Sequence, residues 1–186
     1  KADSLHIALA GHSMGGKIAL LTASKDARPM AVFTIDPVDA AGGIGGSAAD
    51  YPSVTPELMP EIKQPVVFMG EVTDKEAATL SQPCAPAVDN YEQYYNYAES
   101  PALRIDTLGA DHADYVDNPT CTTCITCKGG TANASFVRAL TQKYMIAFFN
   151  MIVRGQRTAY IDYLTGANMA TDKTNGAVDY AYQNEF

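Results

Sequence analysis

Apolar residues are grouped along the chain into four short, mainly hydrophobic runs. They lie at Leu5–Ala10, Met30–Ile35, Pro65–Met69 and Leu103–Leu108 and have the length of buried strands. Largely apolar strands that alternate with helical segments are typical of a parallel sheet covered on both faces. The pattern therefore predicts the α/β class.

Segments of helical periodicity follow these runs. Met14–Ala27 contains good helix formers and stops before Pro29, and a shorter helix is predicted near Asn90–Glu99. A third segment has eight apolar residues on one face of a long amphipathic helix: Phe136, Val137, Leu140, Tyr144, Ala147, Phe148, Met151 and Ile152. The tail after Gly155 is polar and weakly patterned, so it predicts no further element.

Residues 1–186 are expected to form one domain, and residues 36–63 an excursion or lid-like loop. That loop is rich in proline and contains the stretch Gly-Gly-Ile-Gly-Gly. The chain starts a few residues before a buried strand, and four strands with two clear helices make an incomplete sheet. We therefore expect its N-terminal strands to be missing, so that this chain is the C-terminal half to two-thirds of a larger fold.

The composition is that of a globular chain with an acidic balance. Hydrophobic residues make up 47% and charged residues 18%, and the net charge is −8 at pH 7. A negative field repels nucleic acid and anionic membranes, which argues against a nucleic-acid partner. No apolar run approaches the length of about 18 residues that a transmembrane helix needs.

The segment between the first strand and the first helix, Gly-His-Ser-Met-Gly-Gly-Lys, fits two motifs. It matches a phosphate-binding loop until Ile18, which stands where that motif needs a hydroxyl for Mg²⁺. It matches Gly-x-Ser-x-Gly without a defect, and the strand before it and helix after it supply the context of a nucleophile elbow. Ser13 is thus the predicted nucleophile of an α/β-hydrolase fold.

A serine nucleophile needs a base and an acid. Of the three histidines, His112 alone lies outside the first strand and the elbow, and it follows the last strand, where this fold places its histidine. Asp36 and Asp74 each follow a strand and are the candidate acids; Asp36 is favoured because Pro37 fixes its exit from the strand. The backbone N–H of Met14 is the predicted oxyanion donor, and a second donor is expected upstream of this chain.

Several segments together resemble the chlorophyllases, which are α/β-hydrolase esterases. The similar segments are GHSMGGK, FTIDPVDA, VVFMGEV with QPCAPAVDNYEQYY, ADHADYVD and CITCKGG, in that order. The resemblance implies hydrolysis of the phytyl ester of chlorophyll, with Asp36 as the acid, His112 as the base, and no cofactor or catalytic metal. Met14 departs from the family pattern, which usually has arginine there. The resemblance also implies a chloroplast location.

Four cysteines, Cys84, Cys121, Cys124 and Cys127, include three within seven residues. They favour disulfides, for which three pairings are open, while a zinc site with Cys84 as fourth ligand and free thiols are the alternatives. Disulfides would place the chain in an oxidising or luminal compartment.

Two other functions fit the same residues. One is a general lipase or polyester hydrolase, in which Asp74 serves as the acid. The other is a non-catalytic subunit, derived from a hydrolase, that binds pigment or a partner. The expected partner is chlorophyll or another large apolar ester, with peripheral contact to a membrane or a pigment–protein complex.

Overall fold

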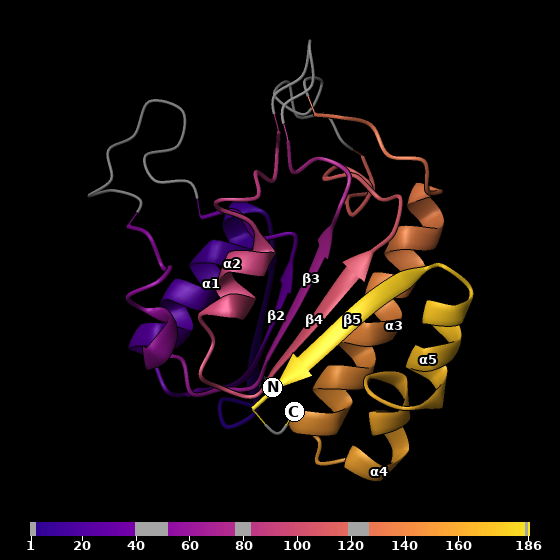
Figure 1. Cartoon of the computed structure of the whole chain (residues 1–186). Coiled ribbons are helices and arrows are strands. Elements are labelled where there is room, and N and C mark those ends of the chain that lie inside the picture. The colour runs from indigo at the N-terminus through magenta and orange to yellow at the C-terminus, as the bar shows by residue number, and fades with distance from the viewer. Residues whose placement is uncertain (1–2, 40–51, 77–82, 119–126, 185) are drawn as a thin grey trace.

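The computed structural model describes residues 3–39, 52–76, 83–118, 127–184 and 186. Its strands form one sheet in the order of the sequence: β1 (Ile7–His12), β2 (Pro29–Ile35), β3 (Val66–Glu71), β4 (Ala102–Thr107) and β5 (Val178–Gln183). β1 to β4 pair in parallel, and β5 pairs with β4 in antiparallel orientation. The carboxyl ends of the parallel strands share one edge, at the top of Figure 1.

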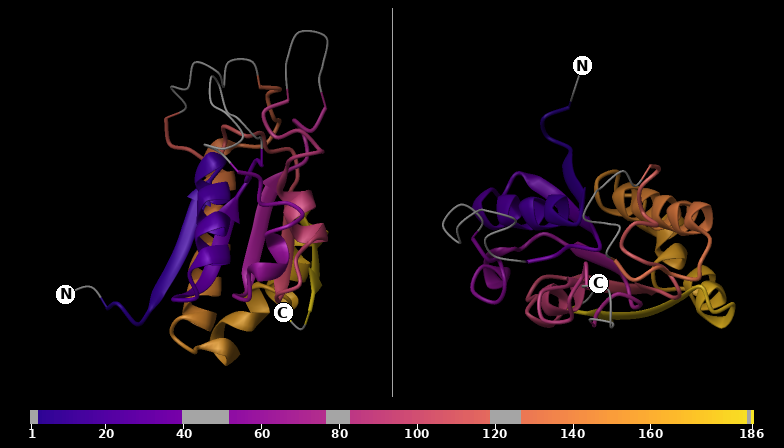
Figure 2. Two further views of the ribbon diagram at one scale, coloured as in Figure 1. Left: turned by 90° about the vertical axis from the view of Figure 1, so that its left-hand side faces the viewer. Right: turned by 90° about the horizontal axis from the view of Figure 1, so that it is seen from above.

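Helices cover both faces of the sheet (Figures 1 and 2). One face carries α1 (Met14–Lys25), the short 3-10 helix η1 (Met59–Glu61) and α2 (Tyr91–Asn96). The other face carries α3 (Ala134–Ile152), α4 (Arg157–Tyr160), the 3-10 helix η3 (Ile161–Tyr163) and α5 (Ala167–Thr174). The predicted α/β class, with a mostly parallel sheet between helices, is confirmed.

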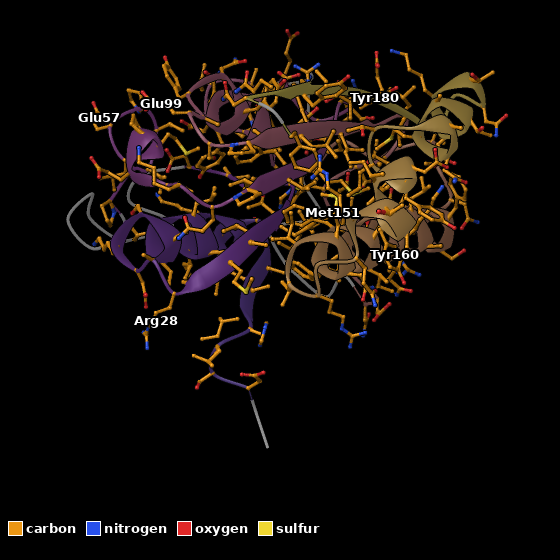
Figure 3. The ribbon with its side chains drawn as sticks, turned by 90° about the horizontal axis from the view of Figure 1, so that it is seen from below. Arg28, Glu57, Glu99, Met151, Tyr160 and Tyr180 are labelled. Atoms are coloured by element: carbon orange, nitrogen blue, oxygen red, sulfur yellow. A yellow bond between two sulfur atoms is a disulfide. The ribbon has the colours of Figure 1, made fainter. Side chains whose placement is uncertain are left out.

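Side chains of successive strand residues point to opposite faces of the sheet, as in any pleated strand. In β2, Ala31 and Phe33 pack with α3, whereas Val32 between them packs with α1 and α2. Figure 3 shows Met151 of α3 inside this layered core and Glu57 at its outer border. Burial on both faces explains why the strands read as apolar runs.

The prediction for the tail after Gly155 was wrong, because this segment forms α4, η3, α5 and β5. Its apolar residues are few, but Leu164, Met169 and Val178 are almost fully buried in the α3-side core. In β5 most side chains are only half-buried, because in the described part of the chain the strand pairs with β4 alone. With so few buried positions, the segment after Gly155 shows little of the hydrophobic periodicity by which helices and strands are predicted.

Two further positions differ from the sequence-based assignment. β1 begins at Ile7, and Leu5 is 79% exposed. Phe136 is exposed although it was assigned to the buried face of the long helix. That helix is longer than the strands it covers, so its first turn, which holds Phe136, extends past their ends (Figure 1).

The predicted loop over 36–63 is described at both ends, and its residues 40–51 lie outside the described residues. Val54 and Met59 are fully buried among the residues of α1 and α2. The C-terminal arm of the loop thus fills the core rather than presenting these side chains to a ligand. Tyr91 and Tyr94 of α2 are likewise fully buried.

Candidate active site

Ser13 lies on the sharp turn between β1 and α1. Its backbone has φ +54° and ψ −123°, a conformation that non-glycine residues rarely adopt. The neighbouring strand holds the turn, because the N–H of Ser13 donates to the carbonyl of Ile35 at 2.9 Å. Strain of this kind concentrates at functional sites and persists where the surroundings enforce it.

Two glycines of the motif have a steric role. A Cβ at Gly11 would lie 2.2 Å from the carbonyl oxygen of Gly15, and one at Gly16 would lie 2.8 Å from the Cβ of Pro37. Gly15 itself faces open space. Close approach between the strand, the helix and the β2 loop therefore explains Gly11 and Gly16, and steric contact does not explain Gly15.

Asp36 follows β2 and is fully buried, with φ +44°. Its N–H donates to the carbonyl of Met69 at 2.6 Å, which ties it to β3. One carboxylate oxygen, Oδ1, accepts the N–H of Glu71 at 3.2 Å, and the other, Oδ2, is left for the histidine. Both oxygens thus face N–H donors.

His112 lies on the loop after β4, and hydrogen bonds to the side chain of Asp111 stabilise this loop. The carboxylate of Asp111 accepts the N–H groups of Ala113 at 2.8 Å, Asp114 at 3.1 Å and Gly130 at 2.7 Å. This fixes the loop against the segment before α3. The side chain of His112 is 8% exposed, so the loop holds the ring inside the protein.

The structure brings Ser13, His112 and Asp36 into one hydrogen-bonded chain. His112 Nδ1 lies 2.6 Å from Asp36 Oδ2, and His112 Nε2 lies 3.0 Å from Ser13 Oγ. Because a carboxylate only accepts, the Asp36 contact assigns the ring proton to Nδ1. Nε2 is then free to accept the proton of the serine hydroxyl.

Burial and neighbouring charges shift the pKa of His112 in opposite directions. Desolvation lowers the pKa of the ring, but the hydrogen bond and charge of Asp36, with a smaller contribution from Asp74, outweigh it and raise that pKa. The neighbouring His12 is the reverse case: burial lowers its pKa to about 4, so it is neutral. Its Nε2–H donates to the carbonyl of His112 at 3.0 Å and helps to hold the loop.

Asp74, the alternative acid, has a different partner. Its Oδ2 accepts the N–H of Cys84 at 2.8 Å, and Cys84 forms a disulfide with Cys127. This bond joins the loop after β3 to the segment before α3. Cys121 and Cys124 lie outside the described residues. With Cys84 and Cys127 bonded to each other, a zinc site that uses both thiolates does not form.

Lys17 does not face a phosphate site. Its side chain is 2% exposed, and its Nζ lies 3.3 Å from Oδ1 of Asp39, which is 1% exposed. The Asp39 carboxylate also accepts hydrogen bonds from Ser53, Val54 and Thr55. The pair joins the first turn of α1 to both ends of the loop over 36–63.

Replacing Lys17 with methionine is expected to lower the free energy of unfolding by about 3–5 kcal/mol, because Asp39 would keep a buried charge without its cation. Urea unfolding of the variant measures this loss. Lys25→Met, at the exposed end of the same helix, is the matched control and should stay within about 0.5 kcal/mol of the parent. A Lys17→Met variant as stable as the parent contradicts the buried pair.

Glu71, His12 and Asp111 were not predicted as site residues. The alternation of a strand gives no sign that its last residue, Glu71, contacts the predicted catalytic acid, Asp36. His12 and Asp111 adjoin the predicted nucleophile and base in sequence, and that adjacency is the signal that could have identified them.

A serine on a strained strand-to-helix turn of a mostly parallel sheet defines the α/β-hydrolase class. A ferulic acid esterase from Streptomyces cinnamoneus superposes on 99% of this chain and 48% of its own, with a TM-score of 0.61 and 17% sequence identity. At that identity the likeness shows the fold.

A family model described as Chlorophyllase matches residues 1–178, and the chain belongs to this family. It is 28% identical to Chlorophyllase-2 of Arabidopsis thaliana over 120 residues, which cover 61% of this chain and 38% of the relative. It is 26% identical to Chlorophyllase-1 of Arabidopsis thaliana over 171 residues, which cover 84% of this chain and 52% of the relative. The chain thus spans about half the length of these relatives, or less.

Proposed function

We propose that the protein is a serine carboxylic ester hydrolase. The observation that carries the proposal is the hydrogen-bonded chain from Ser13 through His112 to Asp36, set on a strained elbow. Family membership supports the same class of reaction.

In the proposed mechanism, Ser13 Oγ attacks the ester carbonyl while His112 Nε2 takes the hydroxyl proton. His112 then returns this proton to the alcohol oxygen as the ester bond breaks, which leaves an acyl group on Ser13. Water attacks the acyl group, with His112 again as the base, and the carboxylic acid leaves. Asp36 holds Nδ1–H and stabilises the imidazolium that forms in each step.

Met14 is the proposed donor to the oxyanion. It is the first residue of α1, so its N–H has no acceptor within the helix and lies at the positive end of the helix dipole. The residue after the nucleophile supplies this donor in α/β hydrolases generally. Its side chain plays no part in the interaction, so methionine serves as well as the arginine usual in the family.

The proposed substrate is the phytyl ester of chlorophyll, and the products are chlorophyllide and phytol. The chlorophyllase family model supports this choice, as does the order of the family-like segments along the chain. The experiment is phytol release from chlorophyll a by the purified protein, with a short p-nitrophenyl ester and a polyester film as competing substrates. Rapid phytol release supports the chlorophyll ester.

The competing substrates separate the other functions. Turnover of the short ester or the film without phytol release would identify a general lipase or polyester hydrolase. Folded full-length protein that hydrolyses none of the three would indicate a non-catalytic subunit that binds pigment or a partner. No helix in the described part of the chain is long and apolar enough to cross a bilayer. A peripheral contact with a membrane or a pigment–protein complex is also proposed.

The proposed compartment is the chloroplast, where chlorophyll is found, or another oxidising lumen. The disulfide between Cys84 and Cys127 supports an oxidising environment, because thiols stay reduced in most cytosols.

The proposed activity should fall as the solution becomes acidic. The mechanism needs a neutral His112, and the pKa of this ring is raised above its ordinary value of 6.5, chiefly by Asp36 acting against burial. Activity is then present above the raised pKa and is lost as the pH falls through it. The pH profile of kcat/KM should show an acid limb with its midpoint above 6.5. A midpoint below that value would contradict the Asp36 contact as the dominant influence.

A further inference from the structure

A second carboxyl group lies directly behind the proposed catalytic acid. Glu71, the last residue of β3, is fully buried. Its backbone N–H donates to Oδ1 of Asp36 at 3.2 Å. Its own Oε2 accepts the N–H groups of Thr73 and, at 2.7 Å, of Asp74. One residue thus holds both the triad acid and the turn that follows β3.

The other oxygen of this carboxyl group, Oε1, is buried and has no hydrogen-bond partner among the described residues. An ionised carboxylate is costly to bury with an unpaired oxygen, whereas a protonated carboxyl group costs much less. The geometry therefore favours an uncharged Glu71.

The groups that face Glu71 support the same protonation state. Asp36 and Asp74 are both fully buried, and His112 and Tyr115 lie close enough to Glu71 to interact with it electrostatically. Three adjacent buried carboxyl groups cannot all be charged beside a single histidine. Burial first, and then the charge of Asp36, raise the pKa of Glu71 to about 8. Burial also raises the pKa of Asp74.

We propose that Glu71 is a positioning residue whose carboxyl group is protonated during turnover and holds the Thr73–Asp74 turn, while its backbone N–H aligns Asp36. Among the described residues, Asp36 is then the single charged partner of the His112 ring within hydrogen-bond distance. The inference rests on the proposed esterase function, in which Asp36 and His112 carry the chemistry.

Glutamine is the test of the uncharged state, because it keeps the acceptor for the turn and has no charge. In the parent, an NMR titration of His112, assigned with a His112→Ala variant, should show a second step near pH 8 as Glu71 ionises. Glu71→Gln should lose that step and leave the acid-side midpoint of His112 unchanged. If Glu71 were already charged at neutral pH, glutamine would remove a negative charge and move this midpoint to lower pH, which overturns the proposal.

The positioning role has its own readout. Glu71→Ala removes the acceptor for the turn and is expected to lower kcat about 10²-fold with little change in KM, the cost of a displaced catalytic group. Glu71→Gln should recover most of that loss. Glu57→Gln, at an exposed glutamate at the border of the fold (Figure 3), is the matched control. Equal losses in the alanine and glutamine variants would contradict positioning by the uncharged group.

The NMR titration needs no substrate, so it separates the two proposals. A protein that lacks esterase activity but shows the step near pH 8 refutes the proposed function and keeps the Glu71 assignment. An active protein that lacks this step supports the proposed function and refutes the protonated state of Glu71. The same titration decides the matter if the alanine variant does not fold.

Discussion

Replacing Ser13 with alanine is expected to abolish measurable ester hydrolysis, with kcat falling by about 10⁶-fold, the loss typical of a serine hydrolase without its nucleophile. The expected size follows from the mechanism, because His112 and Asp36 have no attacking oxygen to activate once the hydroxyl is gone. The fold should be preserved, since alanine is smaller than serine and the N–H of residue 13 still donates to Ile35. Phytol release and circular dichroism on the same sample measure the two effects.

Ser24→Ala is the matched control for this variant. Ser24 lies near the opposite end of α1 and donates to the carbonyl of Leu21, so its loss perturbs the same helix without touching the site. Activity should stay within a few-fold of the parent. Turnover by Ser13→Ala at more than about one-hundredth of the parent rate would show that another group is the nucleophile. Loss of the true nucleophile is expected to lower the rate far more, by about 10⁶-fold.

The elbow was predictable from sequence because its requirements are local. A strand, a helix and glycines at fixed spacing are all visible within a dozen residues, and the structure places Ser13 on the expected turn. His112 was assigned by its order along the chain and its place after the last strand. Order and place left Asp36 and Asp74 both open as the acid, because parallel strands bring their carboxyl ends to one edge. Asp36 was favoured over Asp74 for Pro37 and for the family resemblance.

The parts that could not be predicted depend on partners distant in sequence. β5 has a weak pattern because its place in the sheet is set by β4, more than seventy residues earlier in the chain. In the sequence, Asp39 cannot be told from an ordinary loop aspartate. Its buried contacts with Lys17, Ser53 and Thr55 are formed only in the fold. Glu71 has the sequence pattern of a polar strand end, and neither its burial nor its contact with Asp36, thirty-five residues earlier, is visible from neighbouring residues.

The choice between Asp36 and Asp74 as the acid is decided by a pair of asparagine variants. Asp36→Asn should lower kcat by about 10⁴-fold, because an amide at this position favours the wrong tautomer of the histidine and cannot stabilise its cation. Asp74→Asn should cost about 10-fold or less, because Asp74 binds the N–H of Cys84 and acts on His112 only through its charge. Both variants remove one buried charge near the ring, so each is the control for the other.

The pH profile adds a second, independent measure of the same pair. The hydrogen bond and charge of Asp36 are the largest influences that raise the pKa of His112, and Asp74 has the smallest of the influences identified. Asp36→Asn should therefore move the acid limb of its residual activity to much lower pH than Asp74→Asn does. A larger loss and a larger shift in Asp74→Asn would instead make the end of β3 the source of the catalytic acid. The contact between His112 and Asp36 would then be structural, and the general hydrolase, in which Asp74 serves as the acid, would be favoured over the chlorophyll esterase.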